Sequence, residues 1–231
     1  MKPALTYMPQ LDALRAFAVA CVLTCHFVPF ELQFGIPFGA IGVQTFFVLS
    51  GFLITSILMK NRGNLSPKVS IYKFYARRFL RIFPLYYSVL LVCYLASLEP
   101  IAPSIGWHLT YLGNIQFFLN NEWPGTGSHF WSLCVEEQFY LVWPVLVLCA
   151  SPRSLGNWVW GFFLFGVLCN VIGPVLFPEH RLLGVLPIMN FDSLGAGAIL
   201  AYHGIDSQHK IQEKTQQIIV AACLAILLGM S

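Results

Sequence analysis

The chain has 231 residues, of which 57% are hydrophobic and only 10% are charged, and its formal net charge is +3. Soluble domains carry charge on about a quarter of their residues, so this composition, with a mean hydropathy of +0.70, excludes an ordinary soluble protein. We expect one membrane-embedded, all-α domain over residues 1–231 and no nucleic-acid partner.

Seven apolar stretches are long enough to cross about 30 Å of hydrocarbon, and each is expected to be helical because lipid cannot satisfy backbone polar groups. They cover residues 13–30, 39–59, 82–98, 131–150, 157–177, 188–203 and 216–231. The last stretch ends without a polar flank, so we expect further C-terminal spans to be missing. The sequence therefore predicts a polytopic bundle of transmembrane helices.

The first stretch carries charge inside an apolar helix. Asp12, Arg15, Val19, Val22 and His26 follow a spacing of 3, 4, 3 and 4, which places them on one helix face that should meet protein or a cavity. In one interpretation, Asp12 and Arg15 form an ion pair at the interface and His26 makes a packing hydrogen bond. In the other, neutral His26 is a general base toward a hydroxyl group.

The second stretch is interrupted by Ser50 and Gly51. Small residues in a span usually let two helices approach closely. The same opening could instead admit an acyl chain or a pantetheine arm.

A basic segment follows, with no acidic residue between positions 59 and 82. Its cationic residues are Lys60, Arg62, Lys68, Lys73, Arg77, Arg78 and Arg81. The positive-inside rule places this loop, and with it the N-terminus, in the cytoplasm, which puts His26 in the outer half of the first span. Arg78 and Arg81 share a helix face, so they could clamp phosphates of a cytosolic donor; alternatively, they only orient the protein.

The apolar segment 101–120 contains polar residues, which favours a re-entrant or interfacial segment over another span. Glu136 and Glu137 then open the stretch 131–150, with Glu136, Tyr140 and Trp143 roughly on one face. These carboxylates could take part in chemistry, or they could simply stabilise the positive end of the helix dipole. Trp131, Tyr140 and Trp143 could be interface anchors or a sugar-stacking wall.

The seven cysteines include no C-x-x-C pair, so neither a disulfide framework nor a metal site is predicted. Cys25, next to His26, is interpreted as small apolar filler.

Five segments, in this order, resemble the bacterial membrane acyltransferase family 3. They read LDALRAFAVACVLTCHF, GVQTFFVLSGFLITSILM, FYARRFLRIFPLYY, HFWSLCVEEQFYLVWP and FDSLGAGAILA. The resemblance implies about ten spans in the bacterial inner membrane, so this chain alone need not be an active enzyme. It also implies transfer of an acyl group, such as acetyl, from cytoplasmic acyl-CoA to a hydroxyl of a cell-surface or lipid-linked carbohydrate.

The resemblance also assigns residues. Arg15 and His26 correspond to the essential pair of the first span, and Glu136 and Glu137 to the glutamate motif. Arg78 and Arg81 correspond to the family's arginine pair on the cytoplasmic side. With Ser50 and Gly51, whose opening could admit the pantetheine arm, they are the expected acyl-CoA contacts. The rival hypothesis is a transporter in which the stripe of Asp12, Arg15 and His26 lines a proton or substrate path.

Overall fold

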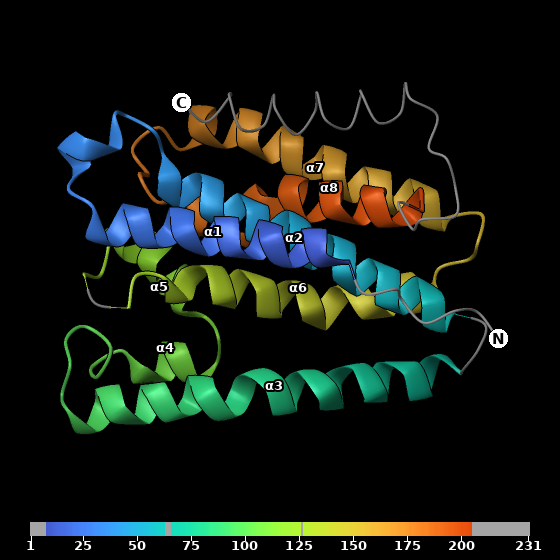
Figure 1. Ribbon diagram of the computed structural model, residues 1–231, viewed down its shortest axis with the longest axis horizontal. Coiled ribbons are helices and arrows are strands. Elements are labelled where there is room, and N and C mark those ends of the chain that lie inside the picture. The colour runs from blue at the N-terminus through green and yellow to red at the C-terminus, as the bar shows by residue number, and fades with distance from the viewer. Residues whose placement is uncertain (1–7, 63–65, 126, 205–231) are drawn as a thin grey trace.

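The computed structural model describes residues 8–62, 66–125 and 127–204 (Figure 1). Within these ranges the chain is helical and contains no strand. The α-helices are α1 (Pro9–Phe27), α2 (Phe38–Asn61), α3 (Pro67–Leu95), α4 (Ile105–Leu109), α5 (Gly113–Asn120), α6 (Phe130–Cys149), α7 (Leu155–Leu176) and α8 (Phe191–Tyr202). Three short 3-10 helices are η1 (Phe30–Gln33), η2 (Leu183–Val185) and η3 (Pro187–Asn190).

Five of these helices, α1, α2, α3, α6 and α7, are long and apolar enough to cross a membrane. They coincide with the first five predicted stretches and confirm the prediction of an all-α membrane bundle. The predicted span 188–203 is shorter than expected, because η3 precedes α8 and the 12 residues of α8 rise only about 18 Å. The stretch 216–231 lies outside the described residues.

The segment 101–120 folds as the short helices α4 and α5, and neither is long enough to cross a membrane. This agrees with the prediction that the segment does not form a span. Asn114 fixes α5 in place, because its amide donates to the backbone carbonyl of Val185 at 3.1 Å and accepts a hydrogen bond from Gln138 at 2.9 Å.

The bundle is organised around α2. This helix packs most extensively against α8 and also contacts α1 and α6, while α7 covers the other side of α8 (Figure 1). Glycines allow the backbones of α2 and α8 to touch: a Cβ at Gly51 would lie 2.0 Å from the Leu194 carbonyl oxygen, and one at Gly197 would lie 2.0 Å from that of Val48. Gly51 therefore has the close-packing role of small residues in membrane helices.

Helix α3 begins 15 residues before the predicted span. Ser66 caps its N-terminus, accepting a hydrogen bond from the Val69 amide, so the basic residues expected in a loop lie on a continuous helix. The 29 residues of α3 rise about 43 Å, which exceeds the hydrocarbon thickness. Helix α3 lies along one edge of the bundle and packs on α6 and α4 (Figure 1).

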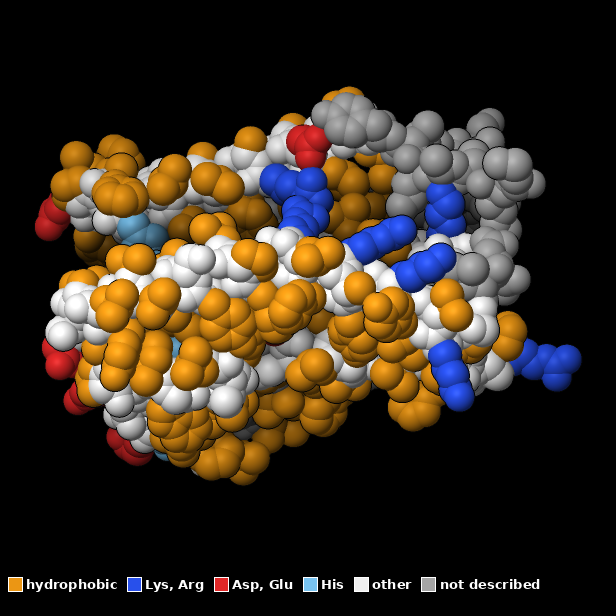
Figure 2. All heavy atoms as spheres, turned by 90° about the horizontal axis from the view of Figure 1, so that it is seen from below, with side chains coloured by type: hydrophobic (Ala, Val, Ile, Leu, Met, Phe, Trp, Pro, Cys, Tyr) orange, Lys and Arg blue, Asp and Glu red, His pale blue; other side chains and the backbone are white. Residues whose placement is uncertain are grey.

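The long helices run side by side, so their connections gather at two ends. Figure 2 shows Lys and Arg side chains toward one end of the face and Asp and Glu toward the other, apart from one acidic side chain near the middle. The connections at the basic end include Arg62 and Arg153. Those at the opposite end carry Glu31, Glu99, Glu122, Glu179 and Arg181.

Candidate active site

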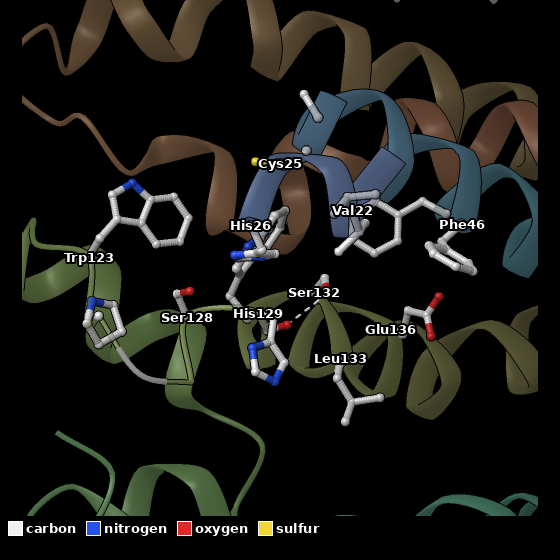
Figure 3. Close-up of a pocket in the computed structure, with 17 residues that line it drawn as sticks. Val22, Cys25, His26, Phe46, Trp123, Ser128, His129, Ser132, Leu133 and Glu136 are labelled. Carbon is white, nitrogen blue, oxygen red and sulfur yellow. Dashed lines mark hydrogen bonds between the residues drawn. The ribbon is translucent and has the colours of Figure 1, made fainter. Parts of the chain in front are cut away.

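A cavity of 630 Å³ opens between α1, α2 and α6 under the connection that precedes α6. In the view of Figure 3, Trp123 lies toward one end of the cavity and Glu136 toward the other, with His26 and Ser132 between them. Two residues predicted from separate parts of the sequence, His26 and Glu136, therefore line the same space. Its remaining walls are largely apolar and come from Val22, Cys25, Gly39, Ala40, Val43, Phe46, Phe47, Pro124, Gly125, Ser128, His129, Trp131 and Leu133.

A second histidine, His129, faces this cavity. It directly precedes α6, and its ring centroid lies 6.4 Å from that of His26, with the ring planes at 81°. Burial lowers the pKa of His129, and the neighbouring His26 lowers it further. His129 is thus neutral near pH 7 and able to accept a proton. Sequence reasoning missed it, although it begins the HFWSLCVEEQ segment.

Glu136 is held from α2. The Ser50 hydroxyl donates a hydrogen bond of 2.6 Å to the Glu136 carboxylate, and the Tyr140 hydroxyl donates one of 3.0 Å to the Ser50 oxygen. Tyr140 is in turn covered by Arg78 of α3, whose guanidinium carbon lies 3.6 Å from the centre of the tyrosine ring. A continuous line of contacts therefore runs from Arg78 through Tyr140 and Ser50 to the carboxylate at the cavity wall.

Arg78 also lines a second pocket, of 250 Å³, between α2 and α3. Four basic side chains and no carboxylate contribute to its wall, and the Nε atom of Arg78 is buried without a hydrogen-bond partner. The basic residues are Lys73, Arg77, Arg78 and Arg81. Such a pocket suits an anionic ligand, since guanidinium groups bind phosphate in a bidentate manner.

Arg15 lies apart from the cavity. Its guanidinium donates to the Asp12 carboxylate at 2.8 Å, and both side chains are close to half exposed. This is the ion pair that one interpretation of the stripe predicted. Val22 and His26 do line the cavity, but Val19 is 46% exposed, so the expectation that the whole stripe faces protein or a cavity is wrong. The side of α1 that packs on α2 instead carries Ala18 and Cys21.

Glu137 does not line the cavity that contains His26, as expected for a residue about 100° around the helix from Glu136. One of its carboxylate oxygens is buried without a hydrogen-bond partner. Tyr111 lies in the connection between α4 and α5. Its pKa is raised mainly by burial and also by the charge of Glu137, so Glu137 lies near this connection.

The aromatic residues of segment 129–144 fall into two groups, those buried in the bundle and those that line the cavity. Tyr140 and Trp143 are only 1% exposed, and the Trp143 indole donates to the Thr55 hydroxyl at 2.8 Å, so neither is an interface anchor. Trp131 instead lines the cavity, with Trp123 from the preceding connection. Among the described residues, no group of three or more His, Cys, Asp or Glu side chains could hold a metal ion.

Residues 8–231 match the acyltransferase family 3 model, described as an acyltransferase domain. Peptidoglycan O-acetyltransferase OatA of Listeria monocytogenes is 34% identical to this chain over 163 residues, covering 62% of this chain and 24% of the relative. A candidate peptidoglycan O-acetyltransferase of Bacillus subtilis is 36% identical over 160 residues, with the same two coverages.

A candidate O-acetyltransferase of Staphylococcus aureus N315 is 31% identical over 184 residues, covering 74% of this chain and 30% of the relative. The chain thus spans 24–30% of the length of these three relatives. No solved structure matches it.

Proposed function

Because the chain belongs to acyltransferase family 3, we propose that it transfers an acyl group, specifically acetyl, from acyl-CoA to a hydroxyl of a carbohydrate. The observation that carries this proposal is the line of contacts from Arg78 to Glu136, which links a basic pocket to a cavity containing His26. Three relatives are named as O-acetyltransferases, which supports acetyl as the group transferred. Two of those names include peptidoglycan, which supports peptidoglycan as the acceptor.

The donor binds at the basic pocket. Arg78 and Arg81, with Lys73 and Arg77 beside them, hold the phosphates of acetyl-CoA, and the thioester reaches toward Ser50 and the cavity. The buried, unpartnered Nε of Arg78 supports this assignment, because a buried donor needs an acceptor.

The acceptor enters the cavity from the acidic end. Trp123 and Trp131 line the cavity and offer flat apolar surfaces on which sugar rings can lie, and Trp123 lies at the side of the cavity away from Glu136 (Figure 3). This arrangement leaves His26 and His129 beside the hydroxyl that is to be acylated.

In the transfer step, His26 takes the proton of the acceptor hydroxyl as its oxygen attacks the thioester carbonyl carbon. The bond between that carbon and the sulfur of CoA breaks, the thiolate takes the proton from the His26 imidazolium, and the products are an ester and free CoA. Glu136, oriented by Ser50, positions the base or the sugar.

The protein would be a multi-pass protein of the inner membrane with its N-terminus in the cytoplasm. Lys60, Arg62, Lys68 and Arg153 occupy the end at which the N-terminal helix begins, which the positive-inside rule assigns to the cytoplasm. Donor and acceptor would then arrive from opposite sides of the membrane.

The rival hypothesis of a transport path along Asp12, Arg15 and His26 has less support. Asp12 and Arg15 pair with each other and do not line the cavity that contains His26.

The test is an acetyl-transfer assay with the full-length protein in nanodiscs, using labelled acetyl-CoA and a peptidoglycan fragment. We expect His26→Ala to slow transfer by about 10²- to 10⁴-fold, the usual contribution of a positioned base. His203→Ala, the same change at the opposite end of the bundle, serves as the control and should retain full activity. A folded His26→Ala variant with undiminished transfer would rule out this mechanism.

A further inference from the structure

A smaller hollow of 160 Å³ adjoins the main cavity. The two share part of their walls, namely Ala40, Val43, Trp123 and Trp131. A molecule lying against the two tryptophans in the main cavity would therefore extend into this hollow. Its far wall carries Gln44, Asn170, Arg181 and Asn190 among apolar residues. This wall comes from α2, α7 and the segment between α7 and α8, a part of the molecule that the transfer step does not use.

The side-chain amide groups of Asn170 and Asn190 in this far wall already donate hydrogen bonds to backbone carbonyls of the protein. The Asn190 side chain donates to the carbonyls of Gly184 and Leu186 at 2.8 and 2.9 Å, and the Asn170 side chain donates to the Met189 carbonyl at 2.9 Å. These bonds hold the connection between α7 and α8 in shape. They leave Arg181, an exposed residue, as the charged donor among those that line the hollow.

Arg181 is anchored through its backbone. Its amide donates to the Asn121 side-chain oxygen at 2.8 Å, and the Asn121 amide group donates to the Glu179 carbonyl at 3.0 Å. Asn121 itself ends α5, so the position of Arg181 is set by two elements of the fold. Within the described ranges, its guanidinium makes no ion pair or hydrogen bond to the protein.

The other charged residues in the described connections at this end of the bundle are acidic. The described connections at this end of the bundle carry four carboxylates, Glu31, Glu99, Glu122 and Glu179, and no other Lys or Arg. The positive-inside rule gives no reason for an arginine at this end, and no carboxylate of the described residues pairs with it. An unpaired guanidinium at a pocket wall is suited to bind a ligand anion.

We propose that this hollow is a subsite for an anionic group of the carbohydrate acceptor, a carboxylate or a phosphate, bound by Arg181. The sugar ring that carries or neighbours the anion lies on Trp123 and Trp131, and the hydroxyl to be acylated lies in the main cavity near His26. The inference rests on the proposed function and makes it more specific, because it selects acidic carbohydrates over neutral ones.

The test is calorimetric binding to the full-length protein in nanodiscs without a donor, so that it does not depend on catalysis. The probes are a uronic-acid oligosaccharide, its carboxyl-reduced neutral counterpart, and the same neutral oligosaccharide carrying a phosphate. We expect at least one anionic probe to bind roughly tenfold or more tightly than the neutral probe, the usual effect of a hydrogen bond to a charged group. Which anionic probe gains affinity tells a carboxylate from a phosphate ligand.

Three variants make the assignment specific. Arg181→Gln should remove the preference for the anionic probe and leave binding of the neutral probe unchanged, whereas Arg181→Lys should keep part of the preference. Arg153→Gln, which removes an exposed arginine at the opposite end, is the matched control and should change nothing.

Equal affinity of the wild-type protein for all three probes, or no binding of any, would overturn the subsite. So would an Arg181→Gln variant that keeps the preference or loses affinity for every probe alike. An acetyl-transfer assay with the same probes is scored separately: absence of transfer to every probe counts against the proposed function, while the binding preference decides the subsite.

Discussion

Ser50 of α2 and Glu136 of α6 lie 86 positions apart in the chain and are joined by a hydrogen bond of 2.6 Å. This bond fixes the carboxylate at the inner wall of the cavity and connects it, through the Tyr140 hydroxyl, to the basic pocket. The geometry of the cavity therefore depends on a hydroxyl from a helix that contributes no charged residue to the cavity wall.

Ser50→Ala is expected to lower the rate of acetyl transfer about 10- to 100-fold, because Glu136 loses a hydrogen bond to a charged group worth about 1.5–3 kcal/mol. The measurement is kcat with saturating acetyl-CoA. Ser56→Ala, on the same helix, is the control and should leave kcat unchanged. An unaltered kcat in Ser50→Ala would mean that the orientation of Glu136 does not matter for transfer.

Arg78→Gln is expected to raise KM for acetyl-CoA at least tenfold, since it removes the guanidinium that we propose binds the phosphates and whose Nε atom is buried without a partner. Arg78→Lys should recover only part of the affinity, because an ammonium cannot cover the Tyr140 ring and bind phosphate in a bidentate manner. Lys68→Gln, an exposed change at the start of α3, is the charge-matched control. If KM does not change in Arg78→Gln, the basic pocket serves only to orient the protein.

Gly197→Ala is expected to destabilise the bundle by about 1–3 kcal/mol or more, because its Cβ would overlap the Val48 carbonyl oxygen at 2.0 Å. Gly161→Ala on α7 is the matched control, since no group of the described residues lies within 4 Å of its Cβ position and alanine favours the helix by up to about 1 kcal/mol. Thermal unfolding in detergent distinguishes the two. Equal melting temperatures would show that α2 and α8 can separate without loss of stability.

The stability of the protein should fall as the pH drops below about 6.5, in part through His108. Burial lowers the pKa of this histidine, which is only 1% exposed, from its ordinary value of 6.5. A histidine with a lowered pKa contributes its full stability above the unfolded value and loses that contribution as the pH falls toward the folded value. His108→Phe should therefore flatten the profile of melting temperature between pH 6.5 and 5. An unchanged slope would assign the acid sensitivity to other groups.

The sequence predicts the helices well because the backbone polar groups of a segment in lipid must be hydrogen-bonded within that segment. It also predicts that Glu136 and Tyr140 share a face, since the period of a helix is fixed. It cannot say which helix lies opposite that face. The hydrogen bond from Ser50 to Glu136, and the position of Arg78 over Tyr140, depend on packing between segments distant in the chain.

The position of residues along a helix matters as well as their direction. Arg15 and His26 share a direction on α1, but eleven residues separate them by about 16 Å along the axis, and only His26 lines the cavity. His129 was missed because it lies just before the first residue of α6. Its spacing of three, four and seven residues to Ser132, Leu133 and Glu136, which line the same cavity, is the signal that could have found it.

The burial of Tyr140 has a consequence for the route from the basic pocket to the cavity. The Tyr140 ring lies between these two spaces, 1% exposed and in edge contact with Phe74, and its hydroxyl is occupied by Ser50. In the described bundle this buried side chain fills the space between Arg78 and Ser50, so the arm of a bound donor would have to pass it before the thioester could reach the cavity.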